Sequence, residues 1–157
     1  MPLMSDLEIR TEDPNSTEVR KLLGRHLRFT RDHSPAEECY ALDETGLDSK
    51  DVSLFGLRDN SELLAIGALK RIEPFHLELK SMHTAESARG RGVGRAMLRQ
   101  LVEWAGSNGY SRISLETGSN AAFTPARLLY ESTGFRICEP FGDYAPSVNS
   151  VHMTLEL

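Results

Sequence analysis

The residues of this sequence that are best suited to chemistry form a glycine-rich stretch accompanied by arginines. The stretch reads Arg89-Gly90-Arg91-Gly92-Val93-Gly94-Arg95. Because three positions lack side chains, phosphate oxygens can approach the backbone N–H groups directly, and the arginines add positive charge. Apolar residues then recur every four positions from Val93 to Ala105, which predicts an amphipathic helix. The first N–H groups of a helix lack partners and lie at the positive end of its dipole, so the stretch predicts a site for a phosphate-bearing ligand.

Spacing excludes two common glycine motifs. A dinucleotide-binding G-x-G-x-x-G needs a third glycine, but that position holds Arg95 when counted from Gly90 and Met97 when counted from Gly92. A P-loop needs Gly-Lys-Ser/Thr after a longer spacing, and that sequence is absent here. The pattern that remains is Arg-x-x-Gly-x-Gly, beside the alternative of a flexible turn that binds nothing.

A second segment, residues 126–135, reads Ala-x-x-x-Tyr-Glu-x-x-Gly-Phe. The two patterns, with the elements between them, resemble the GNAT superfamily of N-acetyltransferases over roughly residues 52–157. The resemblance implies an acyltransferase that uses acetyl-CoA as cosubstrate and needs no metal. Residues 78–82, 115–119 and 138–141 further resemble a bacterial group of small acetyltransferases, the YsnE-like proteins, some of which are labelled indole-acetate acetyltransferases. Site chemistry rather than fold determines the substrate, so the acceptor stays open.

The resemblance also implies where the cosubstrate binds. A backbone amide at the end of the fourth strand is expected to support the thioester oxygen, and the glycine stretch to hold the pyrophosphate. Many members of the superfamily carry asparagine where this chain has Phe123, and Asn120 could take that role only if its loop were rearranged. The expected cofactor-binding residues are Met82, His83, Thr84, Arg89, Gly90, Arg91, Gly92, Val93, Gly94, Arg95, Phe123 and Ala126.

Three residues are the leading catalytic candidates. Tyr130 occupies the general-acid position of the resemblance, and a phenol can give a proton to a thiolate while staying neutral at pH 7; the alternative is an aromatic core residue. Glu78 lies at the strand position of a glutamate base in related enzymes, although a surface carboxylate paired with Lys80 is equally consistent. Glu116 is the rival base and His83 a third choice, while water chains replace a single base in many members.

Other polar residues carry weaker expectations. Asp143, Tyr144 and His152 fall in or after the loop between the last two strands, which the resemblance places near the acceptor pocket. Each is interpreted as an ordinary loop residue and not as catalytic.

The positioning elements follow from apolar periodicity and turn residues. A strand at residues 76–82 is predicted to place Leu77 and Leu79 on one face and Glu78, Lys80 and Met82 on the other. The fold class is α/β, with a mixed (α+β) architecture: a central, mostly antiparallel sheet of six to seven strands flanked by helices on both faces. Strands are expected at 7–10, 52–57, 63–71, 76–82, 112–116, 135–138 and 151–155, and helices at 17–33, 35–41, 93–108 and 125–133.

Composition limits the classes of function. The 157 residues are 39% hydrophobic and 26% charged, which predicts one domain over residues 1–157. A net charge of −5 argues against a nucleic-acid partner, whereas a local cluster of cations suits a small anionic ligand. No apolar run is long enough to span a membrane and no export signal is evident, so a cytoplasmic location is expected. The two cysteines, Cys39 and Cys138, are interpreted as free thiols.

These observations predict an N-acetyltransferase that moves an acetyl group from acetyl-CoA to a primary amine of a small molecule by direct attack in a ternary complex. Two alternatives remain: a catalytically degenerate CoA-binding sensor or interaction module, toward which Phe123 points, and a protein N-acetyltransferase. The resemblance is also compatible with a homodimer.

Overall fold

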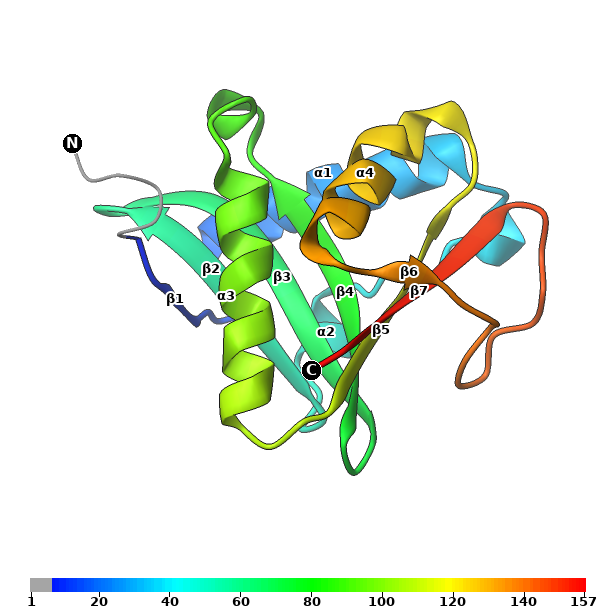
Figure 1. The fold of residues 1–157 in the computed structure, drawn as a ribbon. Helices are drawn as coiled ribbons and strands as arrows, with labels where there is room; N and C mark the ends of the chain where they lie inside the picture. Colours follow the sequence, from blue (N-terminus) through cyan, green and yellow to red (C-terminus); the bar gives the residue numbers. More distant parts are fainter. Residues whose placement is uncertain (1–6) are drawn as a thin grey trace.

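The computed structural model describes residues 7–157 and is built around a seven-stranded sheet with the order β1-β2-β3-β4-β5-β7-β6 (Figure 1). Neighbouring strands are antiparallel except for β4 and β5, which are parallel. The predicted mixed, mostly antiparallel sheet is therefore confirmed. The strands are β1 (Ile9–Thr11), β2 (Val52–Asp59), β3 (Glu62–Glu73), β4 (His76–Thr84), β5 (Arg112–Gly118), β6 (Arg136–Ile137) and β7 (Ser150–Glu156).

Helices cover both faces of this sheet, as predicted. In Figure 1, α3 crosses the near face and α1 lies behind the sheet, while α4 lies beyond the end of β4. The predicted helix ends agree well, because Ser16 caps α1 and left-handed glycines follow α3 and α4. The helices are α1 (Thr17–His33), α2 (Glu44–Leu47), α3 (Val93–Ser107) and α4 (Thr124–Thr133), with short 3-10 turns at Ala36–Glu38, Glu86–Ala88 and Ala121–Phe123.

The predicted short helix at residues 35–41 is wrong in extent. The structure has only the three-residue turn Ala36–Glu38 there, and it adds the unpredicted α2 further along. Asp43 stabilises the start of α2 by accepting a hydrogen bond from the Gly46 N–H at 2.9 Å. Leu47 at the end of α2 is buried with the α1 cluster, which anchors this otherwise weakly patterned segment.

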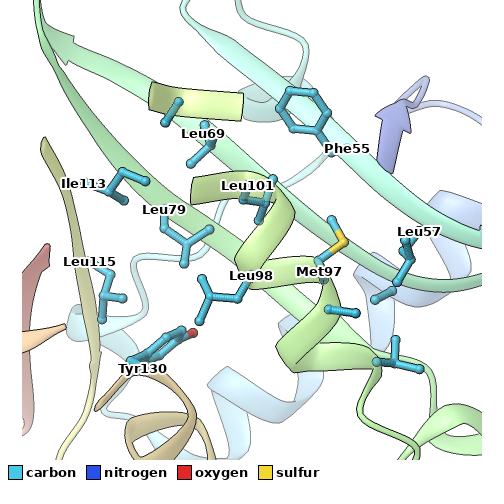
Figure 2. Packing of buried hydrophobic residues seen from close by; sticks show 14 of the residues in the cluster. Phe55, Leu57, Leu69, Leu79, Met97, Leu98, Leu101, Ile113, Leu115 and Tyr130 are labelled. Carbon is cyan, nitrogen blue, oxygen red and sulfur yellow. The ribbon is translucent and has the colours of Figure 1, made fainter. Parts of the chain in front are cut away.

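The hydrophobic core has two parts, one on each side of the sheet. On the α3 side, Met97, Leu98 and Leu101 pack with Leu69 and Leu79 from the central strands (Figure 2). On the α1 side, a smaller cluster joins the helix to β2, β3 and α2; its members include Val19, Leu22, Leu23, Leu54, Ile66 and Ala68. Helices pack on both faces of the sheet that includes β4, the strand that carries part of the site, and most of its residues are buried.

A bulge in β4 corrects the predicted placement of Met82. Lys80 pairs with Ala68 and His83 with Ile66, so two residues of β4, Ser81 and Met82, lie opposite one residue of β3. Ser81 has a φ of 56°, in the left-handed region. The extra residue shifts the alternation, and Met82 packs against the α3-side cluster instead of sharing a face with Lys80.

The two parallel strands separate beyond the bulge. Pairing between β4 and β5 is limited to His76, Leu77 and Glu78 with residues 112–114. Figure 1 shows the strands diverging toward α4. This divergence opens the sheet between Leu79–Thr84 and Leu115–Gly118, so that side chains from both faces can line one cavity.

Residues 7–157 contain neither a membrane-spanning helix nor a cluster of metal ligands. No helix among them combines the length and the apolar character that a membrane span requires. No group of three or more histidine, cysteine, aspartate or glutamate side chains in this part of the chain has an arrangement that could hold a metal ion.

Candidate active site

The glycine stretch forms the turn that opens α3. Gly90 and Gly92 have φ values of 77° and 78°, which L side chains rarely adopt. A Cβ built on either residue would meet no atom within 4 Å, so this side of the turn is open. The Ala96 N–H donates the first helical hydrogen bond, to the Gly92 carbonyl at 3.0 Å. The N–H groups just before Ala96 therefore have no acceptor within the helix.

Gly94 is needed for close packing between elements, and its backbone conformation does not require a glycine. A Cβ there would lie 3.2 Å from the Leu129 side chain and 3.5 Å from Oγ1 of Thr84. The missing side chain therefore lets α4 and the end of β4 approach the start of α3 closely. Together these elements form a cleft of about 350 Å³, lined by Thr84, Ala88, Arg89, Gly90, Gly92, Val93, Gly94, Arg95 and Leu129.

A larger cavity of about 440 Å³ lies where β4 and β5 diverge. Thr84, Arg89 and Leu129 line both this cavity and the cleft at the start of α3, so the two spaces are adjacent and share a wall. Of the predicted cofactor-binding residues, Arg91 alone lines neither space. The lining of the larger cavity includes the polar and aromatic residues His26, Tyr40, Glu78, Lys80, Ser81, His83, Glu116, Phe123, Tyr130 and Tyr144, together with Met82 and Ala126.

Tyr130 lies at the wall between the core and the cavity. Its residue is 8% exposed and its ring packs near Leu98 and Leu115 (Figure 2). It is thus a core residue and a cavity-lining residue at once. Burial, and secondarily the carboxylate of Glu116, raises the pKa of Tyr130 to about 12. The phenol is therefore neutral at pH 7 and carries a proton that it can donate.

Glu78 is part of a buried hydrogen-bonded cluster. The residue is 5% exposed, and its Oε2 accepts hydrogen bonds from the Tyr144 hydroxyl and, at 3.2 Å, from Nζ of Lys80. Lys80 also donates to the Tyr144 hydroxyl oxygen at 3.1 Å. Burial and the carboxylate of Glu78 raise the pKa of Tyr144 well above its ordinary value. The predicted pairing with Lys80 is present, but the pair is buried rather than solvated.

Glu116 reaches the same cavity from β5. Its Oε2 accepts a hydrogen bond from Ser150 at 2.8 Å, and no hydrogen bond to its Oε1 is found within residues 7–157. Burial raises the pKa of Glu116, and the carboxylates of Glu78 and Glu38 act in the same direction, while Ser150 and Lys80 oppose it. This carboxyl group thus combines access to the cavity with increased basicity.

His83 is paired with a histidine that the sequence did not single out. Its Nδ1 lies 3.2 Å from Nδ1 of His26 on α1, and the rings meet edge to face. Burial lowers the pKa of His26 to about 3, with further contributions from His83 and Lys80. Burial also lowers the pKa of His83 to about 4, and Arg89 and Arg25 contribute. Both imidazoles are neutral at pH 7.

Phe123, the departure from the expected asparagine, fills the space above β5. It is buried and packs edge to face against Phe29 with centroids 5.3 Å apart. A Cβ on Gly118 would lie 2.1 Å from the Phe123 ring, which explains the glycine at that position. Asn120 instead accepts a hydrogen bond from the Ala122 N–H and donates to the His33 carbonyl, so its side chain joins two elements.

The structure also brings in residues that sequence reasoning missed or set aside. Tyr144 was treated as an ordinary loop residue, yet it lines the cavity; Asp143 and His152 do not. Tyr40, from the weakly patterned segment after α1, packs edge to face against Tyr144 with centroids 4.9 Å apart. No periodic signal marks either tyrosine, because both come from irregular loops. The alternation of Glu78 and Lys80 on one strand face was the one available hint of the buried cluster.

Comparison with known proteins shows the family to which the chain belongs. Residues 17–135 match the model of the Acetyltransferase (GNAT) family. The chain therefore belongs to that family and is an acyltransferase enzyme, an acetyltransferase.

Individual relatives cover almost the whole chain. It is 41% identical to the uncharacterized N-acetyltransferase YsnE of Bacillus subtilis over 151 residues, which cover 96% of this chain and 100% of that protein. It is 32% identical to the IAA acetyltransferase of Azospirillum brasilense, with 96% and 97% covered. A solved Bacillus subtilis acetyltransferase in complex with CoA shares the fold at a TM-score of 0.72, with 18% identity over 97% of this chain and 99% of that one. The predicted family and fold are thereby confirmed.

Proposed function

We propose that the protein transfers an acetyl group from acetyl-CoA to a primary amine of a small molecule, by direct attack within a ternary complex. The observation that carries the proposal is the shared wall formed by Thr84, Arg89 and Leu129. It joins an anion-binding helix start to a largely apolar cavity with titratable groups in it. A ligand with a phosphate head and a long thin arm fits that arrangement, and CoA has this shape.

The chain's residues fit the pyrophosphate without rearrangement. The open side of Gly90 and Gly92 leaves room for phosphate oxygens at the N–H groups that begin α3. Arg89 and Arg95 line the same cleft and add positive charge. Beyond the shared wall, Met82, His83 and Ala126 line the path of the arm. Near the bulge, a backbone N–H of β4 would support the thioester oxygen.

We assign the role of general base to Glu116. Its raised pKa and its place on the cavity lining suit it to take a proton from the attacking amine. Glu78 is instead engaged by Lys80 and Tyr144, and we assign it to shaping the acceptor end of the cavity. The lowered pKa of His83 makes it a weak base at neutral pH.

Tyr130 is the proposed general acid. When the amine nitrogen bonds to the thioester carbon, the carbon–sulfur bond breaks and the electron pair stays on sulfur. Tyr130 supplies the proton that this sulfur needs, and Glu116 holds the proton lost by the nitrogen. Return of that proton to the tyrosine through water restores both groups. A phenol whose pKa is raised to about 12 keeps its proton until the leaving thiolate forms.

A small acceptor is favoured over a protein by the way two loops close the cavity. Tyr40 and Tyr144 pack against each other, and Ser147 donates hydrogen bonds to both carboxylate oxygens of Glu38 at 2.9 and 3.0 Å. These contacts tie the segment after α1 to the loop before β7. They enclose one end of a cavity of about 440 Å³, a size suited to a small molecule.

Two assays test the proposal together. Calorimetry with CoA measures binding, and release of free thiol from acetyl-CoA with a broad panel of amines measures turnover. Binding without turnover on any acceptor would support the sensor function instead, while no CoA binding at millimolar concentration would overturn the proposal.

A further inference from the structure

The acceptor end of the cavity is defined by five lining residues that do not line the cleft at the start of α3. They are Tyr40, Glu78, Lys80, Glu116 and Tyr144. Two tyrosine rings form its apolar wall, meeting nearly at right angles. Phe141 supports Tyr144 from behind, with centroids 5.2 Å apart. This wall offers aromatic surface to the body of an acceptor.

The charges at this end are mostly negative. Glu78 and Glu116 line the cavity, and Glu38 lies near enough for its carboxylate, with that of Glu116, to raise the pKa of Tyr40 after the larger effect of burial. The cation among these groups is Lys80, whose side chain is 9% exposed. Because Lys80 donates to Glu78 and to Tyr144, its charge is already matched.

The remaining basic residues around the cavity cannot replace Lys80. Arg89 lies at the wall shared with the phosphate cleft, at the opposite end. His26 and His83 are neutral at pH 7, because burial lowers their pKa values to about 3 and about 4. A carboxylate on the acceptor would therefore enter a partly buried site without a counter-ion and would face Glu116. Unpaired charge of this kind is strongly disfavoured.

From this arrangement we infer that the enzyme selects amines that carry no carboxylate, with an aromatic or other apolar body, and rejects the corresponding amino acids. The inference rests on the proposed function and names its acceptor class. A protonated amine is attracted by Glu116 and by the Tyr40 ring before it loses its proton, since Lys80 already lies over the Tyr144 ring, 5.8 Å from its centroid. The selectivity comes from repulsion of the wrong acceptor as much as from attraction of the right one.

Matched acceptors that differ by one carboxylate test the inference. With CoA bound to the protein, calorimetry would compare tryptamine with tryptophan and 2-phenylethylamine with phenylalanine, and indole-3-acetate would serve as an anion without an amine. We expect each amine to bind at least about tenfold more tightly than its amino acid, and the anion more weakly than the amines. Equal or tighter binding of the amino acids or of indole-3-acetate, or no binding of any of these compounds, would overturn the inference.

The same acceptors, assayed for thiol release, separate this inference from the proposed function. Selective binding of amines without turnover would leave the acceptor class intact and overturn the acetyl transfer. Turnover of amino acids as fast as amines would overturn the acceptor class and leave the acetyl transfer intact.

A charge introduced at Ala41, which lines the cavity next to Tyr40, provides a matched pair of variants. In Ala41→Arg, a new cation should reduce the preference for tryptamine over tryptophan about tenfold. In Ala41→Gln, which adds length without charge, the preference should stay near that of the parent protein. Equal preferences in the two variants would show that charge does not set the selectivity.

Discussion

The two ends of the cavity are built in different ways. The phosphate end, the cleft at the start of α3, comes mostly from one short stretch of the chain, residues 88–95, whose glycines and helix start act through the backbone; Thr84 and Leu129 complete its lining. The acceptor end is assembled from four separate parts of the chain: the segment after α1, β4, β5 and the loop before β7. A site made of backbone N–H groups tolerates little variation at its glycines. A site made of side chains on loops can change its substrate while the fold stays the same.

The largest effect should come from disturbing the phosphate end. Gly92→Glu places a side chain at a φ of 78°, which L residues rarely adopt, and a negative charge where the pyrophosphate would lie. We expect the Kd for CoA, measured by calorimetry, to rise at least about 100-fold. Gly106→Glu is the control, because Gly106 lies in the last turn of α3, the helix that Gly92 precedes, and a Cβ there meets no atom within 4 Å. Equal losses in both variants would contradict a localised phosphate site.

The next effect concerns Tyr130, at the junction between the ends. Tyr130→Phe keeps the packing against Leu98 and Leu115 but removes the proton donor. We expect kcat to fall about 10–100-fold while the Kd for CoA is unchanged, as measured by stopped thiol-release assays and calorimetry. Tyr110→Phe, a phenol beside Trp104 and away from the cavity, should leave kcat unchanged. Unaltered turnover in Tyr130→Phe would remove this residue from the mechanism.

The two carboxylates at the acceptor end, Glu116 and Glu78, have different proposed roles, and the pH dependence of activity distinguishes them. The base must be ionised to act, so activity is lost as the pH falls through its pKa. Because burial raises the pKa of Glu116, kcat/KM should decline on the acid side at a pH above the ordinary glutamate range.

Glu116→Gln should lower kcat/KM about tenfold or more and remove this acid limb, whereas Glu78→Gln should retain it. The measurement is a pH profile of kcat/KM for each protein with one amine. An acid limb that disappears in Glu78→Gln and persists in Glu116→Gln would exchange the two assignments.

The smallest effect should come from Tyr144, which joins the loop before β7 to Glu78 and Lys80. Tyr144→Phe removes both hydrogen bonds but keeps the contact with Tyr40. We expect the KM for the amine to rise about three- to tenfold, with the KM for acetyl-CoA unchanged. An equal rise of both values would mean that the two ends do not act separately.

The contrast between a phosphate end built from one stretch and an acceptor end assembled from separate segments explains how much the sequence could predict. The boundaries of α1, α3 and α4, the strands of the sheet and the glycine turn before α3 follow from local signals: apolar periodicity, caps and glycine spacing. The segment after α1 lacks such signals, so its predicted helix at residues 35–41 was wrong in extent and α2 was missed. Met82 was assigned to the wrong face because a bulge at Ser81 leaves no signature in a strand that otherwise alternates. The roles of Tyr40 and Tyr144 depend on loops that meet only in three dimensions. His26 gave no hint either, since its partner is 57 residues away in the chain.

The proposed function requires one ligand to span the cleft at the start of α3 and the cavity between β4 and β5. The most direct test is a crystal structure with acetyl-CoA bound. We expect the pyrophosphate to accept hydrogen bonds from the N–H groups at the start of α3, and the thioester to lie between Tyr130 and Glu116. A pyrophosphate bound elsewhere, or an arm that leaves the cavity and points away from these two residues, would contradict the account.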